Sequence, residues 1–471
     1  MRLTIQEVVD AVEGELAADE NSMRKVVTGI TWDSRKVGEG DIFLAMPGER
    51  VDGNDYITAA IGAGASMIVC TARPSDNLLA VAGEFACPVV VVNDGIEAIT
   101  KLARYWRDQL HCVVVGVTGS TGKTSTKDLL ASVLSTRYNT VATQGNNNNE
   151  LGIPYTVLRA DPETEVLIVE MGMRGLGQIE HGCSIAHPAI GVVTNVGVCH
   201  MELLGSREAI AHAKGEMIAA LPETGLAVVN ADDDMTEFML QEADAAYKSL
   251  HIKRFGRSET ADTKVSNVKL DAEGRASFDL SFGGGIAFPV ELGVAGEHNI
   301  SNALAAAVVG NYLGLSFEQI ARGLKQAGAS GMRMEVAQTA SGVTIINDAY
   351  NANPDSMRAA LATLASMECS GRRIAVLGDM GELGDDEVAL HEQVGRDVAA
   401  ANIDLLIAAG PLAAHIASAA QEAGATCAVE CAADTAAAAS ALKQSVREGD
   451  TVLLKASRFM GFEQIVKEIS E

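Results

Sequence analysis

Positive charge is scarce in this sequence. Its 471 residues include 36 Lys and Arg against 62 Asp and Glu, so the formal net charge at pH 7 is −26. A field of that sign repels nucleic acid and anionic lipid surfaces. We therefore expect no nucleic-acid partner, and any phosphate-bearing ligand must be captured by a local cluster of donors.

Paired cysteines and long apolar runs are also missing. None of the eight cysteines forms a C-x-x-C pair, and no Cys/His spacing matches a zinc site. No apolar run approaches the length of a membrane span, and the amphipathic first 17 residues, expected to be helical, lack the basic and apolar regions of a signal peptide. These absences predict a cytoplasmic protein with reduced thiols and no membrane insertion, and a monomer is the default expectation.

What the sequence does contain is an alternation of short apolar runs with helix-like stretches. Strand followed by helix in this rhythm predicts an α/β protein with parallel sheets covered on both faces. The length should divide into about three domains. We place them at 1–108 (small α/β domain), 109–330 (central parallel-sheet domain, with a β-rich appendage at 252–292) and 331–471 (Rossmann-like domain).

A glycine-rich turn stands between a strand and a helix in the central domain. The apolar run 113–117 predicts a buried strand, the stripe within 125–138 predicts a helix, and TGSTGKT (118–124) lies between them. Gly119 and Gly122 let the backbone amides point inward at an anion, and the helix start adds its positive dipole end. Lys123 supplies a cation for the β/γ-phosphates of ATP, and the Thr124 hydroxyl suits Mg²⁺.

The spacing of this turn departs from the strict G-x-x-x-x-G-K-[ST] pattern. That pattern requires glycine at position 117, where this sequence has Val117; the glycines fall at 116 and 119 instead. The agreement of motif, strand and helix still predicts a phosphate loop.

Polar side chains that suit a metal follow three further segments. Glu170 ends the apolar run 166–169, at the edge where α/β sheets bind ligands, although a helix cap is an equal alternative. His200 follows the next strand and its loop, where a structural role is the alternative. Lys214 shares a helix face with Ile210 and Met217, and it either snorkels to solvent or loses its proton there. A neutral amine in such a place can add CO₂ and become a carbamate, a ligand that suits Mg²⁺.

Taken together, these segments resemble the Mur ligases, ATP-dependent enzymes that build the peptide of peptidoglycan. The resemblance runs in order over essentially the whole chain, through TGSTGKT, EMG at 170–172, TNVGVCHMELLGS at 194–206 and AKGE around position 214. Three segments are similar to the branch that adds D-alanyl-D-alanine to a UDP-N-acetylmuramoyl-tripeptide. They are GNNNNELGIP (145–154), INDAYNANPDSM (346–357) and VLGDMGELG (376–384).

The resemblance implies a role for each matching residue. Catalytic roles fall to Lys123, His200 and Lys214. The implied ATP-binding residues are Gly119, Ser120, Thr121, Gly122, Lys123, Thr124, Ser125, Asn299, Asn302, Arg333, Asp348 and Tyr350. The implied Mg²⁺ ligands are Thr124, Glu170, His200 and a carbamylated Lys214. The implied residues for the UDP-linked substrate and the acceptor are Ser34, Arg35, Gly48, Asp52, Asn54, Asn148, Asn149 and Lys455.

Several of these residues could have a purely structural role instead. Helix capping would also explain the two asparagines near position 300, and ordinary turn chemistry would explain the loop residues. Gln178 and Ala456 depart from the family's usual residues, so acceptor contacts of Lys455 and Arg458 stay open.

The resemblance implies a reaction in which ATP phosphorylates a peptide carboxylate and an amine attacks the acyl phosphate. The alternatives are another Mur-type or folylpolyglutamate-synthetase-like ligase with a different amine, and, from another class, a P-loop nucleotide switch or ATPase. The sequence does not distinguish a tripeptide ending in diaminopimelate from one ending in lysine.

Overall fold

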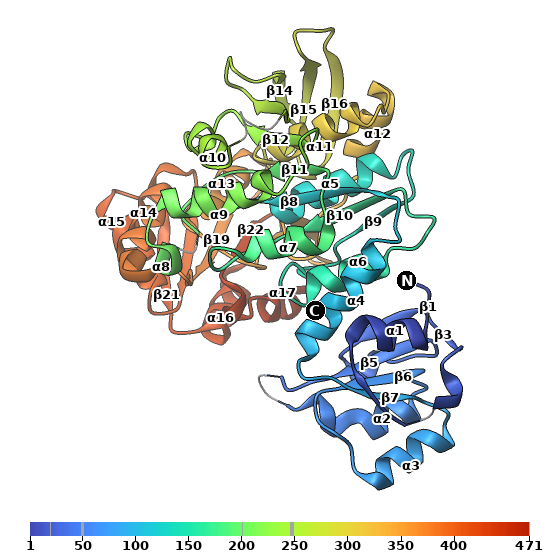
Figure 1. The fold of residues 1–471 in the computed structure, drawn as a ribbon. Coiled ribbons are helices and arrows are strands. Elements are labelled where there is room, and N and C mark those ends of the chain that lie inside the picture. The colour runs from blue at the N-terminus through green and yellow to red at the C-terminus, as the bar shows by residue number, and fades with distance from the viewer. Residues whose placement is uncertain (19, 49–50, 200, 245–248, 471) are drawn as a thin grey trace. The chain divides into compact units, whose positions relative to one another are not determined.

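The computed structural model describes residues 1–18, 20–48, 51–199, 201–244 and 249–470. Helices alternate with strands over most of the chain, as predicted for an α/β protein (Figure 1). The chain divides into two compact units, each described by itself below. The first is Met1–Gly116, Tyr138–Met171 and Glu180–Ala189, and the second is Val117–Arg137, Gly172–Ile179 and Ile190–Glu471. The three predicted domains stay a prediction.

The first unit is built on a five-stranded sheet of order β2-β7-β6-β5-β4. Strands β4 to β7 run parallel to their neighbours, and β2 is antiparallel to β7. The elements of this part are β1 (Leu3–Thr4), α1 (Ile5–Val12), β2 (Glu15–Ala18), β3 (Val26–Val27), β4 (Gly29–Thr31), η2 (Ser34–Lys36), β5 (Asp41–Ala45), η3 (Gly53–Tyr56), α2 (Ile57–Gly62), β6 (Met67–Cys70), α3 (Asp76–Glu84), β7 (Val89–Val91) and α4 (Gly95–Arg107).

The amino-terminal helix is shorter than the 17 residues predicted. Thr4 and Glu7 form a capping box that begins α1, and Glu13, with a left-handed φ of 54°, ends it. The residues after Glu13 pair with β7 as strand β2, so a tertiary contact overrides the helical pattern there.

The rest of the first unit lies later in the chain. It comprises the first four residues of β8 (Val113–Thr118), β9 (Thr140–Ala142), α6 (Gly152–Arg159), β10 (Val166–Glu170) and most of α7 (Gln178–Ala186). Strands β9 and β10 are parallel. Helix α4 packs against α6, and the Trp106 indole donates to the Ala160 carbonyl at 2.9 Å, which joins the two parts of this unit.

The second unit begins with the end of β8 and α5 (Lys123–Leu134). Its first sheet has the order β16-β15-β14-β13-β12-β11, with β11 to β14 parallel and β14 to β16 antiparallel. The elements are β11 (Ile190–Val193), α8 (Met201–Leu204), α9 (Arg207–Ala219), β12 (Leu226–Asn230), α10 (Thr236–Glu242), β13 (His251–Gly256), β14 (Thr263–Leu270), β15 (Arg275–Phe282), β16 (Phe288–Ala295), α11 (Asn299–Tyr312) and α12 (Phe317–Gln326).

The β-rich stretch predicted at 252–292 is confirmed as strands, but it is not a separate appendage. Strand β13 pairs with β12, so the stretch extends the sheet that begins at β11. Its alternating pattern comes from the antiparallel strands at the end of that sheet, which the sequence could not attach to a particular partner.

A second sheet in this unit has the order β17-β18-β22-β19-β20-β21, with only the edge strand β17 antiparallel. The elements are β17 (Glu335–Gln338), β18 (Thr344–Asn347), α13 (Pro354–Ser366), β19 (Arg373–Gly378), η4 (Gly384–Asp386), α14 (Glu387–Ala400), β20 (Leu405–Ala409), α15 (Ala413–Glu422), β21 (Ala428–Ala432), α16 (Thr435–Ser445), β22 (Thr451–Lys455), η5 (Arg458–Met460) and α17 (Glu463–Ser470).

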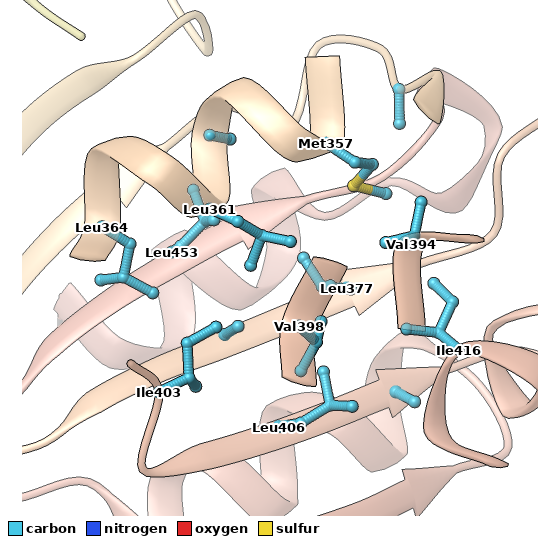
Figure 2. Packing of buried hydrophobic residues seen from close by; sticks show 14 of the residues in the cluster. Met357, Leu361, Leu364, Leu377, Val394, Val398, Ile403, Leu406, Ile416 and Leu453 are labelled. Atoms are coloured by element: carbon cyan, nitrogen blue, oxygen red, sulfur yellow. The ribbon is translucent and has the colours of Figure 1, made fainter. Parts of the chain in front are cut away.

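Apolar side chains from three helices cover one face of this second sheet. Figure 2 shows Leu361 of α13, Val398 of α14 and Ile416 of α15 packed toward Leu377, Leu406 and Leu453 of the strands. Because β18 to β22 run parallel, their carboxyl ends all lie at one edge of this sheet, where loops carry polar residues. None of the helices in the described part of the chain combines the length and the apolar character that a membrane crossing requires.

Candidate active site

The glycine-rich turn after β8 folds its own lysine back over the loop. Gly119 and Gly122 have φ angles of 149° and 77°, which residues with a Cβ rarely adopt. A Cβ on Gly122 would lie 2.5 Å from Asn302 Oδ1, so the turn also needs the missing side chain. The Lys123 ammonium donates to the Gly119 carbonyl at 2.7 Å, and α5 begins at this lysine. A cation and a helix N-terminus at one turn suit a phosphate group.

The loop after β11 braces this turn. The Thr194 hydroxyl donates to the Thr121 carbonyl at 2.6 Å. The Asn195 amide accepts from the Thr121 backbone N–H at 2.9 Å and donates to the Thr121 hydroxyl at 2.8 Å. The Gly197 N–H donates to Ser120 Oγ at 2.9 Å. Sequence analysis matched this segment to the family, but nothing in the sequence shows which loop it contacts.

The two asparagines predicted to bind ATP, Asn299 and Asn302, lie against α5, the helix that begins at the glycine-rich turn. Asn302 accepts from the Thr126 hydroxyl of α5 at 3.1 Å and donates to Asn299 Oδ1 at 2.8 Å. Asn299 donates in turn to the Ala295 carbonyl at 2.7 Å. Neither asparagine caps α11, whose N-cap residue is His298. The helix-cap alternative therefore does not hold, and the pair forms a buried chain of amides beside the turn.

Lys214 is buried in α9, which decides between the two alternatives that its position on the apolar stripe left open. Ser206 is the N-cap of this helix, and the lysine side chain is only 1% exposed. It does not snorkel to solvent. Burial, reinforced by the Lys123 ammonium, lowers the pKa of Lys214 to about 7, against the opposing effects of Cys199 and Asp233. An amine with that pKa is substantially neutral at physiological pH.

Asp233 holds the segment that follows the β11 loop. Its carboxylate accepts from the backbone N–H of Val196 at 2.6 Å and of Met235 at 2.9 Å. Burial raises the pKa of Asp233 in spite of these hydrogen bonds. Arg207 donates to the Val196 carbonyl at 3.0 Å and pairs with Asp234. Sequence analysis missed this carboxylate, since it lies in a polar turn that resembles ordinary loop chemistry.

Glu170 ends β10 in the first unit and is fully buried. Asn148 donates to Glu170 Oε1 at 2.7 Å, so a predicted substrate residue touches a predicted metal ligand. Glu170 does not begin a helix, so the capping alternative fails for it. Asn149 accepts the Gly152 N–H at 3.0 Å and so braces the start of α6.

The four predicted metal ligands are distributed over the two units. Thr124, in the first turn of α5 with Ser125, and Lys214 belong to the second unit, and Glu170 belongs to the first. His200 lies outside the described residues. Among the residues that are described, no three His, Cys, Asp or Glu side chains form a group that could hold a metal ion by themselves.

The residues predicted to reach the nucleotide from the third domain lie together. The Arg333 guanidinium stacks 4.0 Å above the centre of the Tyr350 ring. Asp348 accepts the Met334 N–H at 3.1 Å and pairs with the ammonium of Lys455. Lys455 is 2% exposed and also donates to the Asn351 carbonyl at 3.1 Å. Its charge is thus directed at the 348–351 loop and away from solvent.

In the first unit, two predicted substrate residues sit in a short polar turn. Ser34 and Arg35 belong to η2, which Asp33 caps. Arg35 donates twice to the Asp33 carboxylate, at 2.8 and 2.9 Å, and this pairing lowers the pKa of Asp33 to about 2. The arginine is otherwise exposed and available to a ligand.

A second polar turn holds the remaining predicted substrate residues. The Gly48 N–H donates to the Val51 carbonyl at 2.9 Å. Asp52 caps η3 by accepting the Asn54 backbone N–H at 2.9 Å, and Asn54 reaches Thr71 Oγ1 at 3.0 Å. These contacts are the turn chemistry that the sequence left open as an alternative.

A cavity of about 410 Å³ lies elsewhere in the second unit, between α11 and α13. From α11 it is lined by Ile300, Ser301 and Leu304. On a helix these positions face away from Asn299 and Asn302, whereas Asp355, which also lines the cavity, lies beside Gly197 in the loop that braces the phosphate turn.

Comparison with protein families and known structures covers nearly the whole chain. The family model described as the Mur ligase middle domain matches residues 117–310, the Mur ligase glutamate ligase domain matches 332–458, and the Mur ligase family catalytic domain matches 26–107. The UDP-N-acetylmuramoyl-tripeptide–D-alanyl-D-alanine ligase of Mycobacterium tuberculosis (strain CDC 1551 / Oshkosh) is 40% identical over 497 aligned residues, which cover 98% of this chain and 96% of that protein.

Two solved structures extend this similarity to the fold. The crystal structure of MurF from Acinetobacter baumannii has a TM-score of 0.85 and 32% identity, covering 100% of this chain and 99% of that one. MurF ligase from Thermotoga maritima, solved in complex with ADP, has a TM-score of 0.77 and 28% identity over 94% of this chain and 98% of that one.

Proposed function

The chain belongs to the Mur ligase family, and from that premise we propose that it is an ATP-dependent amide ligase that adds D-alanyl-D-alanine to a UDP-N-acetylmuramoyl-tripeptide. The products would be the UDP-linked pentapeptide, ADP and phosphate, in the synthesis of peptidoglycan precursors. The proposal extends to this chain the activity that the names of its full-length relatives state.

The observation that carries the proposal is the braced phosphate loop. The Gly119 carbonyl holds the Lys123 ammonium, and Thr194 and Asn195 hold Thr121 in the middle of the turn. Preorganised donors of this kind stabilise charge that develops on a transferred phosphoryl group, because they need no reorganisation during the reaction. A loop used only for binding would not need a buried amine such as Lys214 on a neighbouring helix.

Amide formation from a carboxylate in water is uphill, so the carboxylate has to be activated. The terminal carboxylate of the tripeptide attacks the γ-phosphorus of ATP, the bond to ADP breaks, and an acyl phosphate forms. The amine of D-alanyl-D-alanine then attacks the acyl carbon, and the C–O bond to phosphate breaks. Lys123 would neutralise the transferred phosphoryl group in the first step. Exclusion of water protects the acyl phosphate from hydrolysis.

We further propose that Thr124, Glu170, His200 and a carbamate on Lys214 hold Mg²⁺. A hydroxyl and a carboxylate are hard oxygen donors that fit this ion, and a bare ammonium at position 214 would repel it. Burial of Lys214 and its lowered pKa favour the neutral amine that reacts with CO₂. When bound, Mg²⁺ would offset charge on the phosphates.

The remaining predicted residues take part in the same proposal. Asn299, Asn302, Arg333, Asp348 and Tyr350 would contact the nucleotide beyond the phosphate loop. The polar turns at 33–35 and 48–54, with Asn148 and Asn149, would bind the UDP-linked substrate. For Lys455 the contacts favour a supporting role, since its ammonium is engaged by Asp348 and by a backbone carbonyl.

The test is acceptor-dependent release of phosphate from ATP. The purified protein is supplied with Mg²⁺ and a UDP-N-acetylmuramoyl-tripeptide that ends in diaminopimelate or in lysine, and D-alanyl-D-alanine, glutamate or no acceptor is added. We expect phosphate release only when D-alanyl-D-alanine is the acceptor, and a product with the mass of the UDP-linked pentapeptide. ATP hydrolysis that no acceptor changes would identify a nucleotide switch instead, and release with glutamate would identify a ligase with a different amine.

A further inference from the structure

The segment at 194–197, which follows β11, contacts the phosphate turn along one of its sides. Two of its side chains hold Thr121, as described above. The Ser120 N–H donates to the Asn195 carbonyl at 3.0 Å, and the Ser120 hydroxyl accepts the Gly197 N–H at 2.9 Å. Neighbouring residues of the segment therefore contact neighbouring residues of the turn, so a displacement of the segment would displace the turn.

The segment also has little room to move against the turn. A Cβ added to Gly197 would lie 3.3 Å from the Ser120 Cβ. One added to Gly119 would lie 1.8 Å from Thr194 Oγ1. Close-packed groups of this kind transmit a shift to their neighbours, because no void absorbs it.

Val196, in the middle of the segment, is held from another side at both of its backbone groups. Its N–H donates to the Asp233 carboxylate at 2.6 Å, and its carbonyl accepts from the Arg207 guanidinium at 3.0 Å. The Asn230 amide, at the end of β12, donates to the Thr194 carbonyl at 3.0 Å. The segment thus lies between the phosphate turn and a set of polar side chains from β12, the turn that follows it, and α9.

The carboxylate of Asp233 contacts backbone amides through both of its oxygens. Oδ2 accepts the Val196 N–H, and Oδ1 accepts the Met235 N–H at 2.9 Å. Hydrogen bonds to an ionised acceptor are stronger than those between neutral groups, and two of them fix the orientation of the carboxylate. These contacts assign Asp233 an effect on the segment, and through the segment on the phosphate turn.

Arg207 connects the same segment to the helix that carries Lys214. It is the first residue of α9, and its guanidinium also pairs with Asp234 at 2.6 Å. Lys123 of the phosphate turn and Lys214 of α9 are close enough for the charge of one to affect the other. The spacing between these two lysines therefore depends on how firmly Val196 is held.

We propose that Asp233 and Arg207 are positioning residues for phosphoryl transfer, because they hold Val196 between them and so keep the phosphate turn in place beside α9. This inference rests on the proposed function. Donors that are already in place stabilise a transferred phosphoryl group without reorganisation. A displacement of about 1 Å in such a site can lower the rate about 100-fold, even when its cause lies outside the reacting groups.

The main variant is Asp233→Asn, whose side-chain oxygen replaces only one of the two acceptors and whose NH₂ group faces the other backbone N–H. We expect kcat for acceptor-dependent phosphate release to fall about 10- to 100-fold. The Kd of a nonhydrolysable ATP analogue should rise about 5-fold or more, since the turn that binds its phosphates is displaced. At saturating ATP, the KM values for the UDP-linked tripeptide and for D-alanyl-D-alanine should stay within about twofold of the wild-type values.

A matched control and a second variant accompany it. Asp271 also accepts two backbone N–H groups, from Glu273 at 3.1 Å and Arg275 at 2.8 Å, but in the turn between β14 and β15. Asp271→Asn should leave kcat and the Kd of the analogue unchanged. Arg207→Gln should change the same two quantities as Asp233→Asn. The double variant should lose little more than either single variant, because both side chains act on one residue of the segment.

The Arg207 side chain is 35% exposed, so Arg207→Gln provides the test if Asp233→Asn does not fold. Wild-type values of kcat and of the analogue's Kd in these variants would overturn the inference. Equal weakening for ATP, tripeptide and dipeptide would overturn it too, since that result indicates general damage to the fold. A wild-type protein that no acceptor stimulates would instead refute the proposed function, and the Kd of the analogue would still decide whether Asp233 positions the turn.

Discussion

At the scale of single residues, the phosphate loop depends on glycines, because a side chain at these positions would collide with the neighbouring loop. The strict motif requires glycine at 117, yet Val117 lies buried in β8 and the turn begins later. Gly119 would place a Cβ 1.8 Å from Thr194 Oγ1, the hydroxyl that braces the turn. The glycine at position 119 is thus required because the loop that follows β11 packs directly on the turn.

Gly122→Ala should weaken ATP binding. Its φ of 77° strains any other residue, and the added Cβ would approach Asn302 Oδ1. Strain of about 1–3 kcal/mol corresponds to about 5- to 150-fold weaker binding. Titration calorimetry with a nonhydrolysable ATP analogue measures the change. Gly62→Ala is the matched control, since its Cβ would meet no atom within 4 Å. Unchanged affinity in Gly122→Ala would contradict the prediction.

Lys214→Ala should lose activity by on the order of 100-fold or more, because it removes an anionic ligand of the proposed Mg²⁺ site. Bicarbonate should not restore this variant, as no amine remains to carbamylate. Short carboxylates such as acetate, or the substitution Lys214→Glu, should recover part of the rate. The acceptor-dependent phosphate assay gives the comparison, and full activity in Lys214→Ala would remove this residue from the metal site.

At the scale of elements, the sheet edge of the third predicted domain is organised by side chains from its helices. His391 of α14 accepts the Met380 N–H through Nε2, while Nδ1 lies 2.6 Å from the Glu387 carbonyl and donates to it. This arrangement requires the neutral ring. Burial, with a smaller effect of His415, lowers the pKa of His391 in spite of Glu387 and Asp379.

The lowered pKa of His391 predicts how stability depends on pH. Because the folded state binds this proton less readily than the unfolded state, the free energy of unfolding should be highest above the ordinary histidine pKa of about 6.5 and fall as the pH decreases below it. Urea unfolding between pH 7.5 and 5 tests this. His391→Gln should show a weaker dependence over that range, and the exposed His187 gives the control, His187→Gln. An identical slope in His391→Gln would refute the assignment.

At the scale of the whole molecule, the net charge of −26 repels phosphate groups, so local clusters of hydrogen-bond donors and cations have to bind them. The phosphate loop is one such cluster. We propose that the stacked Arg333 and Tyr350, in the third predicted domain, form another. The Ser330 hydroxyl donates to Asp128 of α5, so the segment just before Arg333 is tied to the helix that begins at the phosphate loop. Monomeric state and cytoplasmic location stay predictions.

Protection of the acyl phosphate from water predicts closure of the molecule when substrates bind. The radius of gyration measured by small-angle scattering should decrease when an ATP analogue and the UDP-linked tripeptide are both present. Either ligand alone should give a smaller decrease. An unchanged value with both ligands would count against closure around a hinge near Arg333.

Local patterns in the sequence were sufficient for the α/β class and the family, and both predictions are confirmed. Strands and helices can be predicted from a few consecutive residues, because burial repeats with a period of two or 3.6. The phosphate loop was readable for the same reason, since its strand, turn and helix are consecutive. The place of Lys214 on an apolar stripe was readable for the same reason, but the sequence left open whether its amine is buried or reaches solvent.

Tertiary structure alone decided which distant residues meet. It directed Lys455 to Asp348 and Asn351, set Thr194 and Asn195 against the phosphate loop, and extended the β11 sheet with strands that looked like an appendage. It also brought Asp233 to Val196. Such pairs are separated by tens to hundreds of residues and leave no periodic trace, because the packing of whole elements brings them together.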